Sequence, residues 1–133
     1  GEVRGAEAID MLQALNTGHD GSLSTGHANS PKDMLSRLES MVLMGMDLPL
    51  GAVQRQIASG IDIIVHLGRL RDKSRKVLEV SEILDYQDGE ILVSPLYRFE
   101  ETGEKDGKIQ GTWRKMDDLV HTQKLLAAGY KEV

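Results

Sequence analysis

The sequence predicts an α/β protein with helices in its first half, mostly antiparallel strands in its second half and a helix at the C-terminus. Apolar residues recur at three- and four-residue spacing up to about residue 60, which is typical of amphipathic helices. From Ile61 onward the apolar residues alternate with polar ones, which is typical of strands. The length of 133 residues suits one domain of ordinary size.

A first helix is expected shortly after Gly5, because apolar residues there share one helical face: Ala8, Ile9, Leu12 and Leu15. The pattern ends before Thr17-Gly18, where a loop begins. Ser22–Thr25 then forms a short β-like run that ends at Gly26. This part of the chain therefore predicts a helix, a loop and a short extended segment.

Two further helices follow. Ser30 is a suitable N-cap, Pro31 suits the first helical position, and Asp33 interacts favourably with the positive end of the helix dipole. An apolar stripe runs from this start to Gly45, a plausible stop. The next helix is expected to start near Pro49 and to end at Gly60.

The second half predicts strands. Residues 61–67 alternate in a way that favours a strand buried on the face of Ile61, Ile63, Val65 and Leu67 and partly buried on the other. A basic turn covers residues 69–75. Strands over 76–86 and 90–99 are joined across Asp88-Gly89, a favoured hairpin turn.

The last third is expected to be less regular. Residues 100–107 are polar and contain glycine, which predicts a loop or a disordered tip. A short strand follows over residues 109–113. Residues 117–128 predict a final helix that ends at Gly129.

The composition excludes several classes of protein. The sixteen Lys and Arg against twenty-one Asp and Glu give a net charge of −5, which argues against a nucleic-acid partner. No run approaches the ~20 apolar residues of a membrane span, and no secretion signal precedes the first helix. The chain has no cysteine, which fits a reducing compartment. We expect a cytoplasmic, acidic domain.

The reactive side chains are densest between residues 2 and 29. They are Glu2, Arg4, His19, Asp20, Thr25, His27 and Asn29. Glu2 precedes a helix N-terminus, where a carboxylate can bind a cation or orient a water beside a bound anion. His27 follows Gly26 at the end of the extended run, where backbone or ligand can approach closely.

Three interpretations of this cluster remain open on the residues alone. Taken one by one, these side chains are common as solvated loop residues and surface ion pairs. A metal hydrolase would use His19, Asp20 and His27 with Glu2 as base, but the spacing matches no usual zinc-ligand pattern. Nucleotide chemistry would place the carboxylate and the histidine at two strand ends facing a γ-phosphate.

The motifs themselves resemble a known family. Gly1-Glu2-Val3-Arg4-Gly5 resembles the tail of an atypical Walker B motif, and Thr17-Gly18-His19 with residues 24–29 (STGHAN) resembles a histidine box. These features are similar to the C-terminal half of the secretion-motor ATPases of type II secretion, type IV secretion and Flp pilus assembly. Within that family the CpaF-type ATPases of the Flp (Tad) pilus look most similar. The resemblance implies the C-terminal portion of a RecA-like P-loop NTPase domain.

The resemblance also implies roles for individual residues. Glu2 corresponds to the Walker B glutamate, which helps to organise Mg²⁺ and the attacking water, and His27 corresponds to the histidine that senses the γ-phosphate. Arg4 and His19 match neighbouring positions with supporting roles in nucleotide binding. Thr25 and Asn29 would support the loop. Arg69, Arg71 and Arg75 are equally compatible with a solvated turn, a subunit contact or a catalytic role.

One required motif is missing from these residues. A phosphate cradle of the Gly-x-x-x-x-Gly-Lys-[Ser/Thr] type occurs nowhere in the 133 residues. The resemblance then implies that residues 1–133 begin at the end of Walker B, that Walker A and an N-terminal domain precede them, and that this fragment alone is inactive. The parent would use ATP and Mg²⁺, form a homohexamer and act peripherally at the inner membrane on a platform protein. The alternative is a non-catalytic regulatory or assembly module of a secretion system.

Overall fold

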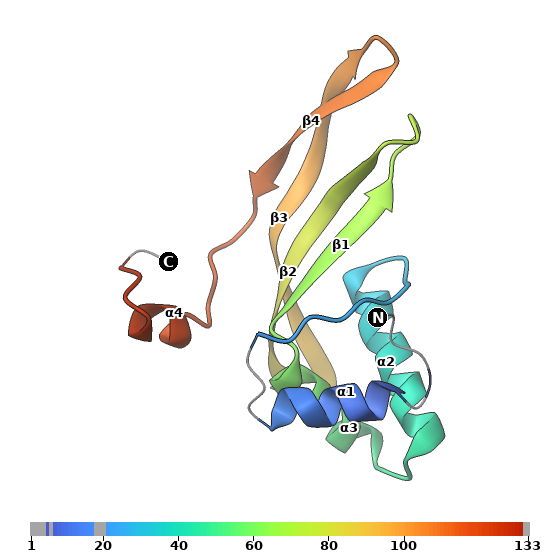
Figure 1. Cartoon of the computed structure of the whole chain (residues 1–133), viewed down its shortest axis with the longest axis vertical. Helices are drawn as coiled ribbons and strands as arrows, with labels where there is room; N and C mark the ends of the chain where they lie inside the picture. Colours follow the sequence, from blue (N-terminus) through green and yellow to red (C-terminus); the bar gives the residue numbers. More distant parts are fainter. Residues whose placement is uncertain (1–4, 6, 18–20, 132–133) are drawn as a thin grey trace. The chain divides into compact units, whose positions relative to one another are not determined.

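A computed structural model describes residue 5, residues 7–17 and residues 21–131. Helices and strands follow the order predicted from the sequence (Figure 1). The chain divides into two compact units: Gly1–Asp62 with Asp85–Val93, and Ile63–Leu84 with Ser94–Val133. Within the described residues, no helix is long and apolar enough to cross a membrane.

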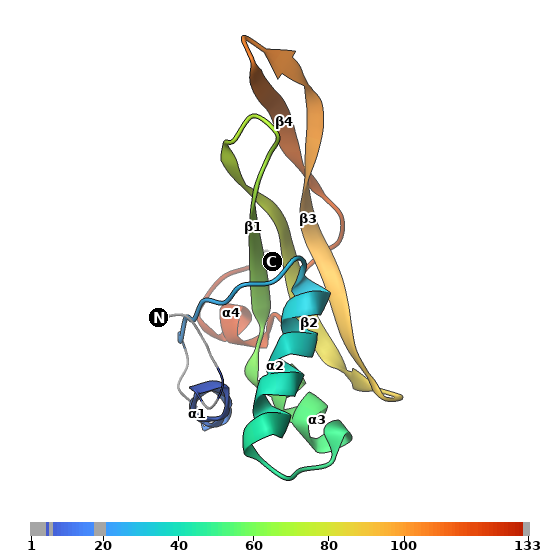
Figure 2. The same cartoon turned by 90° about the vertical axis from the view of Figure 1, so that its right-hand side faces the viewer.

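The first unit contains three helices that contact one another: α1 (Glu7–Asn16), α2 (Pro31–Gly45) and α3 (Leu50–Gly60) (Figure 2). These bounds confirm the predicted helices. The buried apolar residues of the three helices are Ala8, Leu12, Leu35, Leu38, Val42, Val53 and Ile57. Their spacing within each helix produces the apolar stripes seen in the sequence, so the helical periodicity reports a packed core.

Asn16 joins the C-terminal end of α1 to α3. Its side-chain Nδ2 donates to the Leu12 carbonyl at 2.9 Å and to the Gln56 carbonyl at 3.1 Å. The Ser59 hydroxyl donates to Asn16 Oδ1 at 2.5 Å. The Asn16 amide therefore holds the end of α1 against α3, because it donates to Gln56 and accepts from Ser59, both on α3.

The four strands form one sheet in the order β1-β2-β3-β4, built from β1 (Ile63–Arg69), β2 (Arg75–Gln87), β3 (Glu90–Lys105) and β4 (Lys108–Lys115). The pairs β1 with β2 and β3 with β4 are antiparallel. At the β2–β3 turn Asp88 and Gly89 have φ of 53° and 81°, as a two-residue hairpin turn requires, which confirms that prediction.

The prediction of a loop or disordered tip over residues 100–107 is wrong. Strand β3 continues to Lys105, and Asp106-Gly107, with φ of 54° and 75°, forms a second two-residue hairpin turn into β4. A bulge between Glu101 and Gly103 accommodates the extra residue. The polar composition hid a strand, because β3 and β4 are largely exposed here and need no apolar alternation.

The predicted burial of the first strand is also wrong. Ile63, Val65 and Leu67 are 41%, 54% and 66% exposed among the described residues, whereas Ile64 and His66 on the opposite face are less exposed. The strand itself is confirmed, although it starts at Ile63 rather than Ile61. Alternation identifies a two-faced strand, but the elements packed on each face decide which face is buried.

The predicted C-terminal helix is shorter than expected. Helix α4 covers only Gln123–Ala127, Ala128 is its C-cap, and Gly129, with φ of 102°, follows the cap. The backbone N–H groups of Val120 and His121 donate to the carboxylate of Glu82 at 2.8 and 2.9 Å. Residues 117–122 are therefore not helical, because a buried acceptor on β2 takes backbone donors that a helix would use.

Asp72 fixes the β1–β2 turn within the second unit. Its carboxylate accepts from the backbone N–H and hydroxyl of Ser74 and, at 2.8 Å, from the backbone N–H of Ile109 on β4. These bonds, those from Ile109 and Ser74 foremost, lower the pKa of Asp72 to about 2. The turn is consequently bound to a second hairpin rather than free in solvent.

Candidate functional site

The predicted site residues that the structure describes lie on the segment leading into α2 (Figure 1). Thr25, His27 and Asn29 are all exposed on this extended segment. Thr25 forms an isolated β-bridge, so the short strand predicted over Ser22–Thr25 is reduced to one residue. Glu2, Arg4 and His19 lie outside the described residues, and their predicted roles stay predictions.

The segment joins α2 through a reciprocal capping arrangement. Ser30 has extended backbone angles (φ −162°, ψ 166°), and its side-chain oxygen accepts from the backbone N–H of Asp33 at 3.1 Å. In return, Asp33 Oδ2 accepts from the backbone N–H of Asn29 at 3.0 Å. This arrangement confirms the predicted helix start and connects the residues before the helix rigidly to its first turn.

Asp33 adds a fixed negative charge to this helix start. The hydrogen bond from the Asn29 N–H lowers the pKa of the Asp33 carboxyl, and Arg37, at 3.3 Å from Oδ2, lowers it further. The carboxylate is therefore ionised at neutral pH. It interacts favourably with the helix dipole at the end of α2 nearest His27.

Gly26 allows a close approach, as its position beside His27 suggested. A Cβ atom at this position would lie 2.9 Å from the sulfur of Met34, which is shorter than real Cβ contacts. The group that approaches is thus a side chain of α2. A larger residue here would require the end of the Met34 side chain to move.

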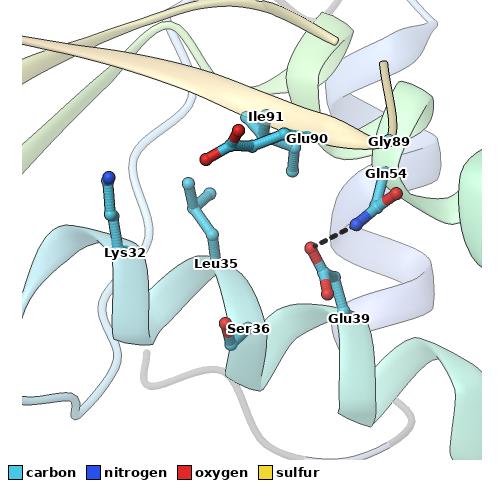
Figure 3. A pocket seen from close by; sticks show the side chains of 8 residues that line it. All are labelled: Lys32, Leu35, Ser36, Glu39, Gln54, Gly89, Glu90 and Ile91. Atoms are coloured by element: carbon cyan, nitrogen blue, oxygen red, sulfur yellow. Dashed lines mark hydrogen bonds between the residues drawn. The ribbon is translucent and has the colours of Figure 1, made fainter. Parts of the chain in front are cut away.

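A recess lies elsewhere in the first unit, between α2, α3 and the β2–β3 turn (Figure 3). Its volume is about 210 Å³, below the ~300 Å³ at which pockets for drug-sized ligands begin. Its lining residues are Lys32, Leu35, Ser36, Glu39, Gln54, Gly89, Glu90 and Ile91. The predicted site residues that the structure describes, Thr25, His27 and Asn29, are not among the residues that line this recess.

The recess contains a polar pair that sequence reasoning missed. Gln54, only 9% exposed, donates from Nε2 to Glu39 Oε1 at 3.3 Å (Figure 3). The only signal in the sequence is a polar residue next to Val53 on an apolar helix stripe, and such a residue rarely indicates a site by itself. The pair satisfies a buried amide between two helices.

Metal binding finds no support in the described part of the chain. No group of three or more His, Asp or Glu side chains is placed to hold a metal ion in residue 5, residues 7–17 or residues 21–131. The metal-hydrolase alternative used Glu2, His19 and Asp20, which lie outside those residues. That alternative therefore stays a prediction.

Comparisons with known proteins identify the family. The profile of the family described as "Type II/IV secretion system protein" matches residues 1–120. The crystal structure of the VirB11 ATPase from the Brucella suis type IV secretion system, in complex with sulphate, superposes with a TM-score of 0.57 at 33% identity. That match covers 62% of this chain and 26% of the VirB11 chain.

Two relatives support the same assignment. The conjugal transfer protein TrbB of Rhizobium radiobacter is 36% identical over 88 residues, 66% of this chain and 26% of that protein. The type IV secretion system protein PtlH of Bordetella pertussis is 37% identical over 93 residues, again 66% and 26%. The chain spans about a quarter of the length of the curated relatives it matches.

The fold and the comparisons together define the class of protein. The chain has the α/β fold of the C-terminal portion of a RecA-like P-loop NTPase domain. The chain belongs to the type II/IV secretion system protein family. The family match and the structural match confirm that the motifs resemble those of the secretion ATPases.

Proposed function

We propose that this chain is the part of a secretion-motor ATPase that runs from the end of Walker B onward. The observation that carries the proposal is the family match over residues 1–120, combined with a VirB11-like fold at 33% identity. The parent would hydrolyse ATP with Mg²⁺ to power pilus assembly or type II/IV secretion. We assign it to the CpaF-type motors of the Flp pilus on the motifs of residues 1–29.

Within the proposal, Glu2 orients the attacking water and His27 contacts the γ-phosphate, with Arg4 and His19 supporting the nucleotide. The exposure of His27 on the segment before α2 is compatible with a ligand contact. The 133 residues contain no phosphate cradle, so the cradle would come from another part of the parent, and Glu2 would help to organise Mg²⁺ beside it. Fragment inactivity follows from the same lack of a cradle.

The capping arrangement suggests how His27 reports on the nucleotide. His27 lies three residues before Ser30, and the Asn29–Asp33 and Ser30–Asp33 hydrogen bonds couple this segment to the first turn of α2. A displacement of His27 would therefore move the helix as well as the loop. Thr25 and Asn29 act in this scheme as supports of the segment, not as groups that touch substrate.

The proposed surroundings of the parent follow the same family logic. It would assemble as a homohexamer and act at the cytoplasmic side of the inner membrane on a platform protein. The acidic net charge of −5 fits a motor that has no nucleic-acid partner.

Variants of the full-length parent test the site. Glu2→Gln should lower ATP turnover by at least ~10²-fold with ATP binding retained, because it removes the group that activates water. His27→Ala should also reduce turnover while the fold persists. His66→Ala, a histidine of β1 outside the motif, is the matched control and should keep full activity. Normal turnover in Glu2→Gln would remove the assignment of Glu2 as the group that activates water, whereas a parent reading frame without a P-loop would contradict the motor and favour the non-catalytic assembly module.

A further inference from the structure

Two arginines face each other at the open end of the β1–β2 hairpin. The register of the pair places Arg69 directly opposite Arg75, and both are exposed. Directly opposed side chains on one sheet face have Cβ atoms about 4.5–5.5 Å apart, and like charges at that distance destabilise the pair. This arrangement calls for a negative group that offsets the repulsion.

Within the described residues no such group is present. Neither guanidinium forms an ion pair or a hydrogen bond with a described side chain. The sheet has a second opposed arginine pair, Arg98 with Arg114, and there Glu79 binds Arg98 at 2.8 Å while Glu100 lies 3.9 Å from Arg114. Among the described residues, the fold thus supplies carboxylates for one arginine pair and none for the other.

The turn that presents the pair is held in a defined shape. The Leu70 N–H donates to the Ser74 carbonyl at 2.8 Å, and the Lys73 N–H donates to the Leu70 carbonyl at 2.9 Å. Arg71, between the two arginines, is bound by Glu101, with Glu104 at 3.8 Å. Because the backbone is already ordered, a partner that binds Arg69 and Arg75 loses less conformational entropy.

The distribution of charge along the chain indicates the partner. The first unit contains four basic and eleven acidic residues, whereas the second contains twelve basic and ten acidic. Five of those twelve basic residues lie in residues 69–76, against Asp72 as the single acidic residue there. The exposed carboxylates of the first unit are Glu7, Asp10, Asp47, Asp62, Asp85, Asp88 and Glu90.

We propose that Arg69 and Arg75 form a carboxylate-binding pair that docks on the acidic first unit of a second copy of this chain. Such a contact joins two different surfaces, so it repeats head to tail and builds a ring or a filament rather than a closed two-fold dimer. The inference deepens the proposed homo-oligomeric motor and rests on it. Paired guanidiniums suit this role because each can bind a carboxylate with two hydrogen bonds.

Sedimentation of the 133-residue chain tests the contact independently of ATP hydrolysis. Wild-type chain should self-associate at low ionic strength and dissociate in salt, and Arg69→Glu with Arg75→Glu should weaken association by about tenfold or more. Lys105→Glu with Lys108→Glu is the matched control, since it reverses two charges that also face each other across a hairpin. A wild-type chain that stays monomeric, or equal loss in the control, would overturn the proposal.

Crosslinking identifies the surface that is bound. Arg69→Lys with Arg75→Lys keeps the charges and supplies amines that a carbodiimide joins to adjacent carboxylates, and mixing ¹⁴N and ¹⁵N copies distinguishes crosslinks between molecules. We expect intermolecular crosslinks to carboxylates of the first unit. Crosslinks confined to the second unit would overturn it. If these tests of the contact fail but Glu2→Gln inactivates the full-length parent, the proposed ATPase function still stands.

Discussion

At the scale of single residues, side chains that bind nearby backbone were predictable and those that bind distant backbone were not. Ser30, Pro31 and Asp33 were placed correctly at a helix start, because a cap is a local interaction whose partners lie within four residues. Glu82 falls within the strand predicted over residues 76–86, and nothing beside it in the sequence indicates its partners. Its partners are backbone donors 38 and 39 residues further on, and no local pattern announces them.

Asp72 leads to a prediction of pH dependence. Its folded pKa of about 2 lies below the ~3.9 of an unfolded aspartate, so the unfolded chain binds the proton more readily. The stabilisation is complete above about pH 4 and is lost as the pH falls toward 2. Urea unfolding followed by circular dichroism checks this. The urea concentration at the midpoint should fall as the pH falls from about 4 to about 2, and it should fall less in Asp72→Asn.

Asp62→Asn is the control for that measurement, because its exposed carboxylate makes no hydrogen bond with the described residues. It should keep the wild-type pH slope. Equal slopes in Asp72→Asn and wild type would show that the bonds to Ile109 and Ser74 do not depend on ionisation.

At the scale of elements, helices were easier to predict than strands. The bounds of α2 and α3 agree with the sequence prediction to within a residue, since caps and glycines mark both ends. The β3–β4 hairpin was missed between residues 100 and 107, although Asp106-Gly107 repeats the turn signal of Asp88-Gly89. Exposed strands have no apolar alternation, and a polar stretch with glycine resembles a loop.

Gly111 is a test of the β3–β4 hairpin. A Cβ at this position would lie 2.4 Å from Cζ of Phe99 and 2.5 Å from the backbone oxygen of Glu100. The backbone atom cannot rotate away, so Gly111→Ala should lower the free energy of unfolding by about 1–3 kcal/mol. Gly103→Ala in the same hairpin meets no atom within 4 Å and should change it by less than about 0.5 kcal/mol. Denaturant unfolding of both variants measures these changes. An equal loss of unfolding free energy in the two variants would contradict the steric explanation.

Glu82 is a test of the C-terminal segment. Its side chain is 1% exposed, and Glu82→Ala would leave the N–H groups of Val120 and His121 without their acceptor, at a cost of about 1–3 kcal/mol. Hydrogen exchange of those two amides should accelerate. His121→Ala removes the imidazole 3.1 Å from Glu82 but keeps both backbone donors, so the amides should stay protected. Loss of protection in His121→Ala would assign the anchoring to the contact between the imidazole and Glu82 instead.

At the scale of the whole molecule, the chain matches the family over residues 1–120 and yet spans only about a quarter of the length of its relatives. The motifs at residues 1–29 led to the family, and the fold agrees with it. The exposed apolar row of Ile63, Val65 and Leu67 could not be foreseen, because burial of a strand face depends on which elements cover it.

Nucleotide titration tests the proposal for the fragment as a whole. Calorimetry of the 133-residue chain with Mg·ATP should give no saturable heat up to roughly millimolar nucleotide, since no lysine-containing phosphate cradle is present. The full-length parent measured alongside should bind. Micromolar binding by the fragment would contradict the assignment of the cradle to other residues.

The sequence by itself determined the α/β class, the three helices of the first half, the hairpin turn at Asp88-Gly89 and the secretion-ATPase family. Periodicity, capping, turn signals and motifs are all local in the chain. Only the tertiary structure decided the buried state of Glu82, the exposed face of β1, the extent of β3 and α4, and the opposition of Arg69 and Arg75 across the β1–β2 turn. Each of these depends on contacts between residues far apart in sequence, where burial and the supply of partners override local preference.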